Sequence, residues 1–474
     1  MRILLIAMPE TADCIDFVTR LPNLALINIA GSLHGHEVKV LDFVAVKPAI
    51  RKPLEEIVAS FKPDLVGLSA MTFQFETLVR VAAFCRERLP AAMIVAGGYH
   101  ATLLAREIID EQPDLPLDFM VRGEGEHTMR ELVDALENEK AGFDNILGLS
   151  YRCPTGWLHN EARPLADLAS LPLPDRTVRI AGGFHWLELP MDVAETSRGC
   201  PYNCKFCSIN KMYGNSFRPF PVERIISDLK VIRAAGTRAV FFADDNITYD
   251  TGHFMQVCEA IIGCGLTDMA FMVQATAAGL ANNPDLVRIM DRANFRFVFV
   301  GFESMLPVDL KSVRKPTNPA INQQAAELLR KHGIAIIAGC IVGYPDDDRQ
   351  SIRRNYRLIR QLIPDMIYAQ YMTPYPKTLV REELLAAGLV ENIDGYSSYD
   401  GFTCNIRTRN LSRDELYRCL KKEALLGYTD LKMVYHNYFG RHHGRYFLWA
   451  LIKVICVNII NVCTLRQRKN KFDI

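Results

Sequence analysis

The feature of this chain that most constrains its fold is a regular alternation of short apolar runs with amphipathic stretches between residues 222 and 371. The apolar runs have the length of buried strands, and the stretches between them place apolar residues three and four positions apart, as one face of a helix does. Strands that alternate with helices form a parallel sheet, because two parallel strands need a crossover connection. We therefore expect functional residues at the carboxyl ends of the strands.

Six strands are predicted from about residue 200 to residue 371. The first of them lies before residue 222 and carries a run of cysteines near residue 200. The other predicted strands are Ala239–Phe242, Ala270–Val273, Phe297–Val300, Ile334–Ile341 and Met366–Tyr371. The predicted helices are Val222–Ala234, Phe254–Ile262, Asp285–Arg292, Ile321–Lys331 and Ser351–Leu362. The expected architecture is a partial (β/α)6 barrel of the TIM-like kind.

The first 128 residues alternate in the same way and predict a second α/β element, a doubly wound, Rossmann-like parallel sheet with helices on both faces. Its predicted strands are Ile3–Ala7, Val38–Asp42, Leu65–Ser69, Met93–Ala96 and Phe119–Val121, and its first helices are Leu24–Leu33 and Leu54–Phe61. Small or hydroxyl residues end several of these strands, so a ligand can approach the backbone closely there.

A connector punctuated by prolines separates the two sheets, and each proline biases the preceding residue away from helix. A predicted helix, Met129–Leu136, leads into the connector. The connector contains a predicted small hairpin of Ile146–Tyr151 with Trp157–Leu158. We expect four parts: an N-terminal domain of residues 1–135, the connector 136–190, the barrel 191–375, and a C-terminal helical region 376–474 that ends in a basic amphipathic tail.

Three cysteines, Cys200, Cys204 and Cys207, stand in the spacing Cys-x3-Cys-x2-Cys within a segment rich in Gly, Pro and Asn. Such a segment can wrap around one centre, and three thiolates suit an iron–sulfur cluster or a zinc ion. A cubane cluster usually takes four cysteine ligands, and no fourth cysteine lies near this run. One iron would then be open to another ligand, which indicates a catalytic site.

This run, with Phe206 directly before the last cysteine, resembles the signature of the radical S-adenosylmethionine (SAM) enzymes. The resemblance implies that the three cysteines bind a 4Fe-4S cluster and that the open iron chelates SAM. It also implies that an electron from the cluster cleaves SAM to a 5′-deoxyadenosyl radical. An electron donor such as flavodoxin or ferredoxin is implied as a partner.

The resemblance also assigns roles to polar residues at the strand ends. SAM presents a positive amino group and two ribose hydroxyls, which carboxylates bind well. Glu303 is expected to contact the ribose, and the segment 341–345, which includes Gly343, to border the adenine; Gln274 is a further candidate contact. The Gly-Gly-Glu form of the second-strand motif is replaced by Ala-Asp-Asp, so both Asp244 and Asp245 stay open as the contact of the amino group.

The strand ends of the N-terminal sheet resemble the cobalamin-binding domain that precedes many radical SAM domains. The candidate cobalamin contacts are Ser69, Thr72, Gly97, Gly98, His100, Gly123 and Glu124. The usual lower-ligand motif, Asp-x-His-x-x-Gly, is absent, and His34 and His36 are predicted turn residues. The absence of this motif leaves two possibilities. The domain binds cobalamin without a histidine ligand to the cobalt, or it keeps the fold and has lost the cofactor. Two of the candidate cobalamin contacts have an ordinary alternative role. His100 can simply cap the end of a strand, and Glu124 can be a carboxylate that is favoured at the start of a helix.

Charge is distributed unevenly along the chain. The net charge is only +1, which favours no nucleic-acid partner, yet residues 431–474 carry eight Lys and Arg against a single acid. Within them Tyr446–Leu465 is apolar but interrupted by Lys453, Asn458 and Asn461. Residues 446–471 therefore fit a helix that lies in an anionic membrane surface better than one that crosses it. A helix packed on the protein is the alternative.

Thirteen scattered cysteines and a short N-terminal apolar run without a secretory pattern indicate that the protein lies in a reducing cytosol. The tail predicts peripheral contact with the inner face of the membrane. Tyr368, Tyr371, Tyr375 and Tyr399 are expected either to contact substrate or to pack. The predicted function is C-methylation of an unactivated carbon in a small-molecule substrate, a lipid or isoprenoid if the tail binds membrane. The alternatives are a radical oxidative cyclase or rearrangement enzyme of the tetrapyrrole type, and a non-catalytic iron–sulfur or zinc redox sensor.

Overall fold

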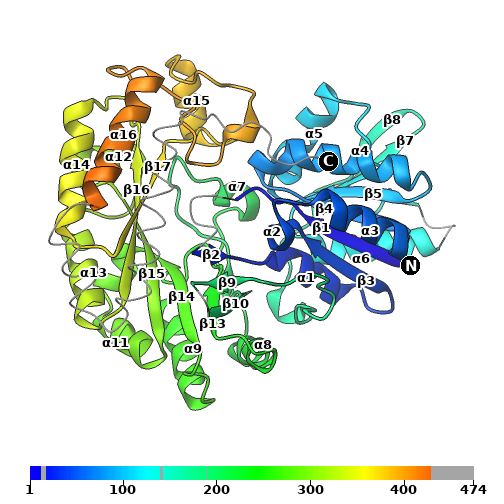
Figure 1. The fold of residues 1–474 in the computed structure, drawn as a ribbon, viewed down its shortest axis with the longest axis horizontal. Helices are drawn as coiled ribbons and strands as arrows, with labels where there is room; N and C mark the ends of the chain where they lie inside the picture. Colours follow the sequence, from blue (N-terminus) through cyan, green and yellow to red (C-terminus); the bar gives the residue numbers. More distant parts are fainter. Residues whose placement is uncertain (12–17, 139–141, 188, 429–474) are drawn as a thin grey trace. The chain divides into compact units, whose positions relative to one another are not determined.

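The computed structural model describes residues 1–11, 18–138, 142–187 and 189–428. The chain forms two compact units, and the main division between them falls between Phe184 and His185. Each unit has its own large sheet, and the elements of both are labelled in Figure 1. The tail helix predicted at 446–471 lies outside the described residues. Within the described residues, no helix combines the length and the apolar character needed to cross a bilayer.

The first unit contains a seven-stranded sheet in the order β3-β1-β4-β5-β6-β7-β8. Its strands are β1 (Arg2–Ala7), β3 (Glu37–Asp42), β4 (Leu65–Ser69), β5 (Met93–Gly97), β6 (Phe119–Val121), β7 (Leu149–Cys153) and β8 (Gly156–His159). The first five strands in this order are parallel to their neighbours, whereas β7 and β8 form an antiparallel hairpin. The predicted hairpin therefore exists, and it extends the first sheet beyond β6.

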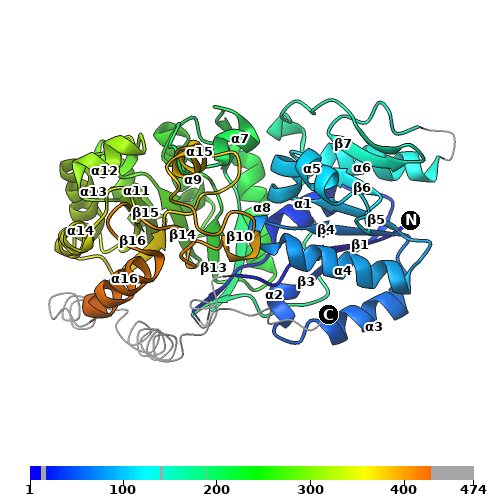
Figure 2. The ribbon, with the colours of Figure 1, turned by 90° about the horizontal axis from the view of Figure 1, so that it is seen from above.

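Helices cover both faces of this sheet. They are α1 (Leu24–Ser32), α2 (Phe43–Val46), α3 (Arg51–Phe61), α4 (Phe75–Arg88), α5 (Tyr99–Glu111) and α6 (Gly125–Glu137), with short 3-10 turns η1 (Thr72–Gln74) and η2 (Leu168–Ser170). Ile3 and Leu5 of β1 share a buried cluster with apolar residues of α1 and α6. Figure 2 shows α3 and α4 on the opposite face. The predicted doubly wound fold is confirmed.

The second unit contains an eight-stranded sheet in the order β17-β16-β15-β14-β13-β10-β9-β2. Its strands are β2 (Thr19–Arg20), β9 (His185–Trp186), β10 (Leu189–Ala194), β13 (Ala239–Phe242), β14 (Ala270–Ala275), β15 (Phe295–Glu303), β16 (Ala335–Val342) and β17 (Met366–Tyr371). The six strands from β10 to β17 are parallel. This curved sheet confirms the predicted partial barrel of six parallel strands.

Helices follow the strands of the second unit and lie along the outer side of its sheet (Figure 1). They are α8 (Val222–Ala234), α9 (Thr251–Gly263), α10 (Ala277–Ala281), α11 (Pro284–Arg292), α12 (Pro307–Ser312), α13 (Pro319–Lys331) and α14 (Arg349–Gln361). Beyond the barrel come α15 (Leu379–Ala386), η3 (Tyr396–Ser398) and α16 (Arg413–Tyr428). Phe242, Phe254, Phe271 and Phe295 pack together where strands meet helices, with ring centroids 5.2 to 5.9 Å apart.

Two of the differences from the prediction have clear reasons in the sequence. The first barrel strand, β10, ends at Ala194, so the cysteines follow it in a loop and the expected cysteine-bearing strand was wrong. Pro190 and Asp192 interrupt the apolar pattern of β10, and for this reason the pattern does not predict a strand there. Helix α6 begins four residues before its predicted start at Met129, because its first turn carries polar residues outside the apolar repeat.

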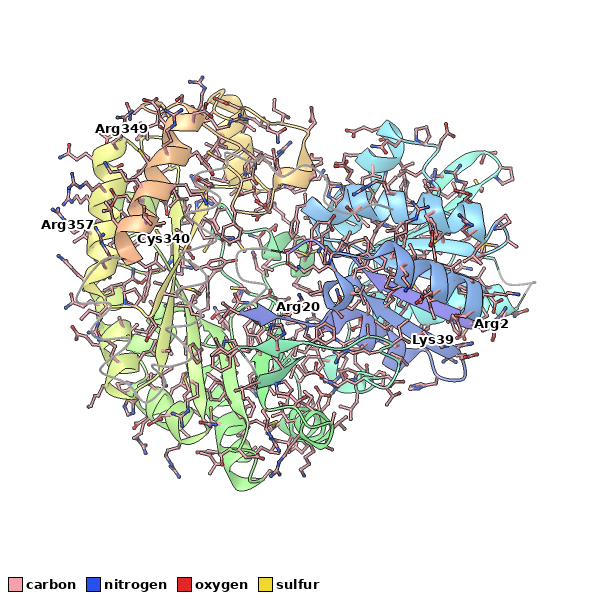
Figure 3. All side chains as sticks on the ribbon, viewed as in Figure 1. Arg2, Arg20, Lys39, Cys340, Arg349 and Arg357 are labelled. Carbon is pink, nitrogen blue, oxygen red and sulfur yellow. The ribbon has the colours of Figure 1, made fainter. Side chains whose placement is uncertain are left out.

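Side chains on the barrel divide into buried and outward-facing groups. Cys340 lies within β16, where it is buried, in agreement with its interpretation as a small apolar residue (Figure 3). Arg349 and Arg357 project outward from α14 in the same view (Figure 3). Cys340 thus belongs to the barrel core, whereas the two arginines face solvent. The polar residues predicted for the functional site lie at the carboxyl ends of the strands.

Candidate functional site

The three cysteines lie in a loop that a short ladder closes at its base. β11 (Ser197–Arg198) pairs antiparallel with β12 (Arg218–Pro219), and the short helix α7 (Ile209–Tyr213) lies between them. Gly199 has φ +89°, and a Cβ there would stand 2.5 Å from the carbonyl oxygen of Ser216. Only glycine fits this close approach. The loop that carries the cysteines is therefore built on a fixed entry and exit.

Three successive residues that follow β13, Asp244, Asp245 and Asn246, form hydrogen bonds with the start of this loop. The carboxylate of Asp244 accepts hydrogen bonds from the backbone N of Thr196 (3.0 Å) and from the hydroxyls of Thr196 (2.7 Å) and Ser197 (2.5 Å). Asp245 accepts from the backbone N of Gly199 at 2.9 Å, and Asn246 Nδ2 donates to Cys200 Sγ at 3.7 Å. One strand end thus fixes the loop up to its first cysteine.

Asp244 and Asp245 differ in exposure. Asp244 is fully buried, and burial raises its pKa to about 7 although the hydrogen bonds from Ser197 and Thr196 lower it in part. Asp245 is half-buried, and burial raises its pKa to about 6. Because the hydrogen bonds of Asp244 are all to the loop, it acts as a positioning residue. The predicted contact with the amino group of SAM is better served by Asp245, although both contacts stay predictions.

The three thiols share one environment. Burial raises the pKa of Cys204 to about 11 and that of Cys207 to about 12, and for Cys207 the nearby thiols of Cys204 and Cys200 add to the rise. Three soft sulfur donors in one half-buried loop fit an iron–sulfur cluster. In the described part of the chain, no three Cys, His, Asp or Glu side chains converge on a single ion, and the thiolates of a cubane each bind a different iron.

Lys205, which lies between Cys204 and Cys207, ties the loop to two later segments. Its backbone N donates to Val313 O at 3.0 Å, and its carbonyl accepts from Val380 N at 3.0 Å. Its ammonium pairs with Glu383 Oε1 of α15 at 2.6 Å. The segment beyond the barrel therefore helps to hold the cysteine loop, a role that nothing in the sequence indicated.

Glu303 ends β15 in a strained conformation and is paired. Its φ is +61°, and the register with β16 shifts between Gly301 and Glu303. Glu303 Oε1 stands 2.7 Å from the ammonium of Lys315, and each side chain is 12% exposed. Burial alone would lower the pKa of Lys315, but the Glu303 carboxylate and the Cys204 and Cys207 thiols outweigh it and raise that pKa. Lys315 is the main residue of this site that sequence reasoning missed.

The remaining predicted SAM contacts fall into two groups. Phe206 and Gln274 are partly exposed, and the side-chain amide of Gln274, unlike its backbone in the β14–β15 ladder, forms no hydrogen bond with a described residue, so both side chains are available to a ligand. The ring of Phe206 has the Lys315 ammonium 5.9 Å from its centroid. Gly343 has φ +93° and lies against Ile406 and Leu416, so its glycine is explained by packing. Its contact with adenine stays a prediction.

The four tyrosines divide by burial. Tyr371 and Tyr399 are buried, and their hydroxyls donate to the backbone oxygens of Tyr417 and Asn392, so these two pack as structural residues. Tyr368 is half-buried, with its ring edge-on to Phe299 at 5.6 Å and to Phe402 at 5.1 Å. Tyr375 is also partly exposed. Tyr368 and Tyr375 keep the predicted role of substrate contacts.

In the first unit, the ends of β4 and β5 lie side by side, with Ser69 opposite Gly97. Gly98 has φ +91°, and a Cβ there would stand 2.7 Å from Ala70 O and 3.0 Å from Ser69 Oγ. A Cβ at Gly97 would meet nothing nearer than 3.7 Å. Thr72 is buried in the turn after β4. The fold therefore requires Gly98, whereas a Cβ at Gly97 would make only ordinary van der Waals contact with Val121.

The other predicted cobalamin contacts surround this edge. His100 is buried with its ring 4.5 Å from that of Phe75, and burial lowers its pKa to about 4, so it is neutral. Thr102 Oγ1 donates to Gly98 O at 2.8 Å and accepts from Gly123 N at 3.0 Å, which joins two of the predicted corners. Glu124 accepts from Ala166 N at 2.8 Å, a structural contact. A corner rich in glycine with open space at Gly123 fits a bulky planar cofactor.

Alanine at two adjacent glycines should separate folding from cofactor contact. Gly98→Ala should destabilise the first unit by at least about 2 kcal/mol, because Ala is strained at positive φ and its Cβ would clash with Ala70. Gly97→Ala should leave the urea midpoint unchanged and weaken cobalamin binding at least about tenfold. Urea unfolding and cobalamin titration measure the two effects. Unchanged cobalamin affinity in Gly97→Ala would refute a contact at that residue.

Comparison with known proteins matches both units. Residues 11–133 match the B12 binding domain family, and residues 194–359 match the Radical SAM superfamily. An uncharacterized methyltransferase of Pyrococcus horikoshii is 30% identical over 454 residues, which cover 94% of this chain and 96% of the relative. The hopanoid C-3 methylase of Methylococcus capsulatus is 29% identical over 371 residues, with coverages of 76% and 71%.

Two further likenesses complete the comparison. The anaerobic magnesium-protoporphyrin IX monomethyl ester cyclase of Synechocystis is 28% identical over 365 residues, which cover 75% of this chain and 71% of the relative. The solved structure of the radical SAM methyltransferase TsrM from Kitasatospora setae, with cobalamin and a 4Fe-4S cluster bound, has a TM-score of 0.71. It covers 97% of this chain and 99% of that one at 15% identity, and so shows the shared fold. The predicted family is confirmed: the chain belongs to the radical SAM enzymes that carry an N-terminal B12-binding domain.

Proposed function

We propose that this enzyme transfers a methyl group to an unactivated carbon of a small-molecule substrate, with a lipid or isoprenoid as the favoured class. The observation that carries the proposal is the cysteine loop, which the Asp244–Asn246 run fixes at the end of a barrel strand, in a chain that also has a B12-binding domain. The likeness to a hopanoid methylase supports the lipid class.

The cofactors supply the reactive chemistry, and the protein supplies position and exclusion of water. When bound, the 4Fe-4S cluster provides the electron for cleavage of SAM, and cobalamin carries the methyl group. Cys200, Cys204 and Cys207 would hold the cluster. We assign the hydrogen bond with a positive amino group to Asp245, because its side chain is partly exposed and the bond from Gly199 N occupies only one of its two carboxylate oxygens.

The residues of the barrel interior provide the surface for SAM and substrate. Gln274 offers a side-chain amide that no described residue binds, and Tyr368 offers a half-buried ring. Phe299 and Phe402 flank that ring, so the wall there is apolar, as a lipid or isoprenoid carbon requires. The proposed role of Tyr368 is thus to line the substrate site.

The mass of the product tests the proposed reaction. Anaerobically reconstituted enzyme with cobalamin, SAM and a strong reductant is incubated with hopanoid and linear isoprenoid substrates. Methylation predicts a product heavier by one methylene and a stoichiometric yield of S-adenosylhomocysteine with 5′-deoxyadenosine. Formation of 5′-deoxyadenosine with a product that has lost hydrogen, and no methylene gain, would contradict methylation.

A second reaction is favoured by one observation, the likeness to an anaerobic magnesium-protoporphyrin cyclase. A cyclase would act on a tetrapyrrole ester and form a ring without gain of a methylene. Incubation of the same reconstituted enzyme with magnesium-protoporphyrin monomethyl ester separates the two reactions, because ring closure changes the visible absorption of the tetrapyrrole. An unchanged tetrapyrrole with a methylated lipid supports the first proposal.

A further inference from the structure

A largely buried positive charge lies against the cysteine loop. The side chain of Lys315 is 12% exposed, its ammonium faces the ring of Phe206 at 5.9 Å, and its electrostatic partners include Cys204 and Cys207. A lysine buried to this extent is rare unless it is paired, because its charge loses the stabilisation that water gives. Its place next to the loop therefore needs an explanation.

The residue that pairs with Lys315 has a strained backbone. Glu303, the partner of Lys315, has a positive φ at a register shift, a conformation that is strained for a residue other than glycine. A Cβ at Gly301 would stand 2.5 Å from Glu303 Oε1 and 3.0 Å from Lys315 Nζ, so a glycine leaves the room that the pair occupies. The bulge, the strain and the glycine together aim one carboxylate at one ammonium.

The backbone around Lys315 is fixed as well. Lys315 N donates to Leu310 O at 2.9 Å, its carbonyl accepts from Thr317 N at 2.9 Å, and the preceding segment accepts from Lys205 N of the cysteine loop through Val313 O. The loop and the segment that carries the lysine are therefore joined directly. The ammonium is held at a set position relative to Cys204 rather than left to swing into solvent.

We propose that Lys315 is a positioning residue that sets the reduction potential of the cluster, with Glu303 as the group that holds it and moderates its charge. The inference rests on the cluster site of the proposed function and not on methyl transfer. A fixed positive charge near a thiolate-bound cluster favours the form that has gained one electron from a low-potential donor. Lys315 thus makes the cluster easier to reduce, and Glu303 limits that effect.

Redox titration of the reconstituted 4Fe-4S protein, without SAM or substrate, tests the proposal. Lys315→Met should shift the midpoint potential to more negative values, because the cation is gone and Glu303 is left uncompensated. Glu303→Gln should shift it in the opposite direction, because Lys315 is then unmoderated. The double variant should fall between the two single variants, as a coupled pair does.

Lys311→Met is the matched control, since it removes the same charge from an exposed position four residues earlier and should leave the potential unchanged. A Lys315→Met potential equal to that of this control, in protein with full cluster content, would overturn the proposal. If Lys315→Met does not take up a cluster, Glu303→Gln decides alone, and the absence of a positive shift overturns it. Failure of methyl transfer would leave these potentials as they are, so the two proposals fail separately.

Discussion

Replacement of Cys204 by alanine should abolish the cluster and with it all formation of 5′-deoxyadenosine. Cys204 is the middle of three thiols that share one half-buried loop, and the loop is tied on either side by Gly199 and Lys205. With two ligands left, a cubane cluster lacks the set of thiolates that retains it. Iron and sulfide content, the broad visible absorption of the reconstituted protein, and 5′-deoxyadenosine formation measure the loss.

Cys264→Ala is the matched control for this variant. Cys264 is exposed at the end of α9, outside the loop, and its replacement should change neither iron content nor SAM cleavage. A Cys204→Ala protein that keeps full cluster content and full cleavage would show that the ligand set is assigned wrongly. A Cys264→Ala protein that loses its cluster would do the same.

Replacement of Asp244 by alanine should lower the free energy of unfolding of the second unit by roughly 3 kcal/mol, since it leaves buried donors without their acceptor. Asp244 is fully buried and accepts from Thr196 N, Thr196 Oγ1 and Ser197 Oγ, the residues that lead into the cysteine loop. The loop should loosen as well, so iron content should fall even where the protein folds. Urea unfolding and iron analysis measure the two effects.

Asp268→Ala provides the comparison for a carboxylate that does not hold the loop. Asp268 is exposed and pairs with Arg233 at 3.0 Å, and such surface pairs contribute at most about 1 kcal/mol. We expect near wild-type stability and cluster content for this variant. Equal effects of the Asp244 and Asp268 changes would remove the positioning role that the structure gives to Asp244.

Much of the fold could be predicted from the sequence because the alternation of strand and helix is regular. The strand β13 begins and ends at the predicted residues because its run is wholly apolar, and β17 does so although Gln370 interrupts its run once. β10 was missed because Pro190 and Asp192 break its apolar pattern, although pairing with β13 makes it a strand. Tertiary pairing therefore overrides local pattern at the strand that precedes the cysteine loop.

The candidate site was predictable only where residue type and spacing are specific. Three cysteines at fixed spacing indicate a cluster without any knowledge of the fold. Lys315 gave no such signal, because a lysine after a helix is ordinary, and its meaning comes from a register shift and a positive φ at Glu303 that bring the two together. The division of work between Asp244 and Asp245 likewise depends on which of the two is fully buried.

The iron and cobalt content of the protein, purified without oxygen and supplied with iron, sulfide and cobalamin, tests the central claim most directly. We predict about four iron atoms and about one cobalt atom per chain, with the absorption of both cofactors in one spectrum. The likeness to a B12-binding domain over residues 11–133 and the cysteine loop of the second unit lead to this result. Full iron content with no cobalt retained would contradict the account of the first unit, and the absence of both would contradict the account as a whole.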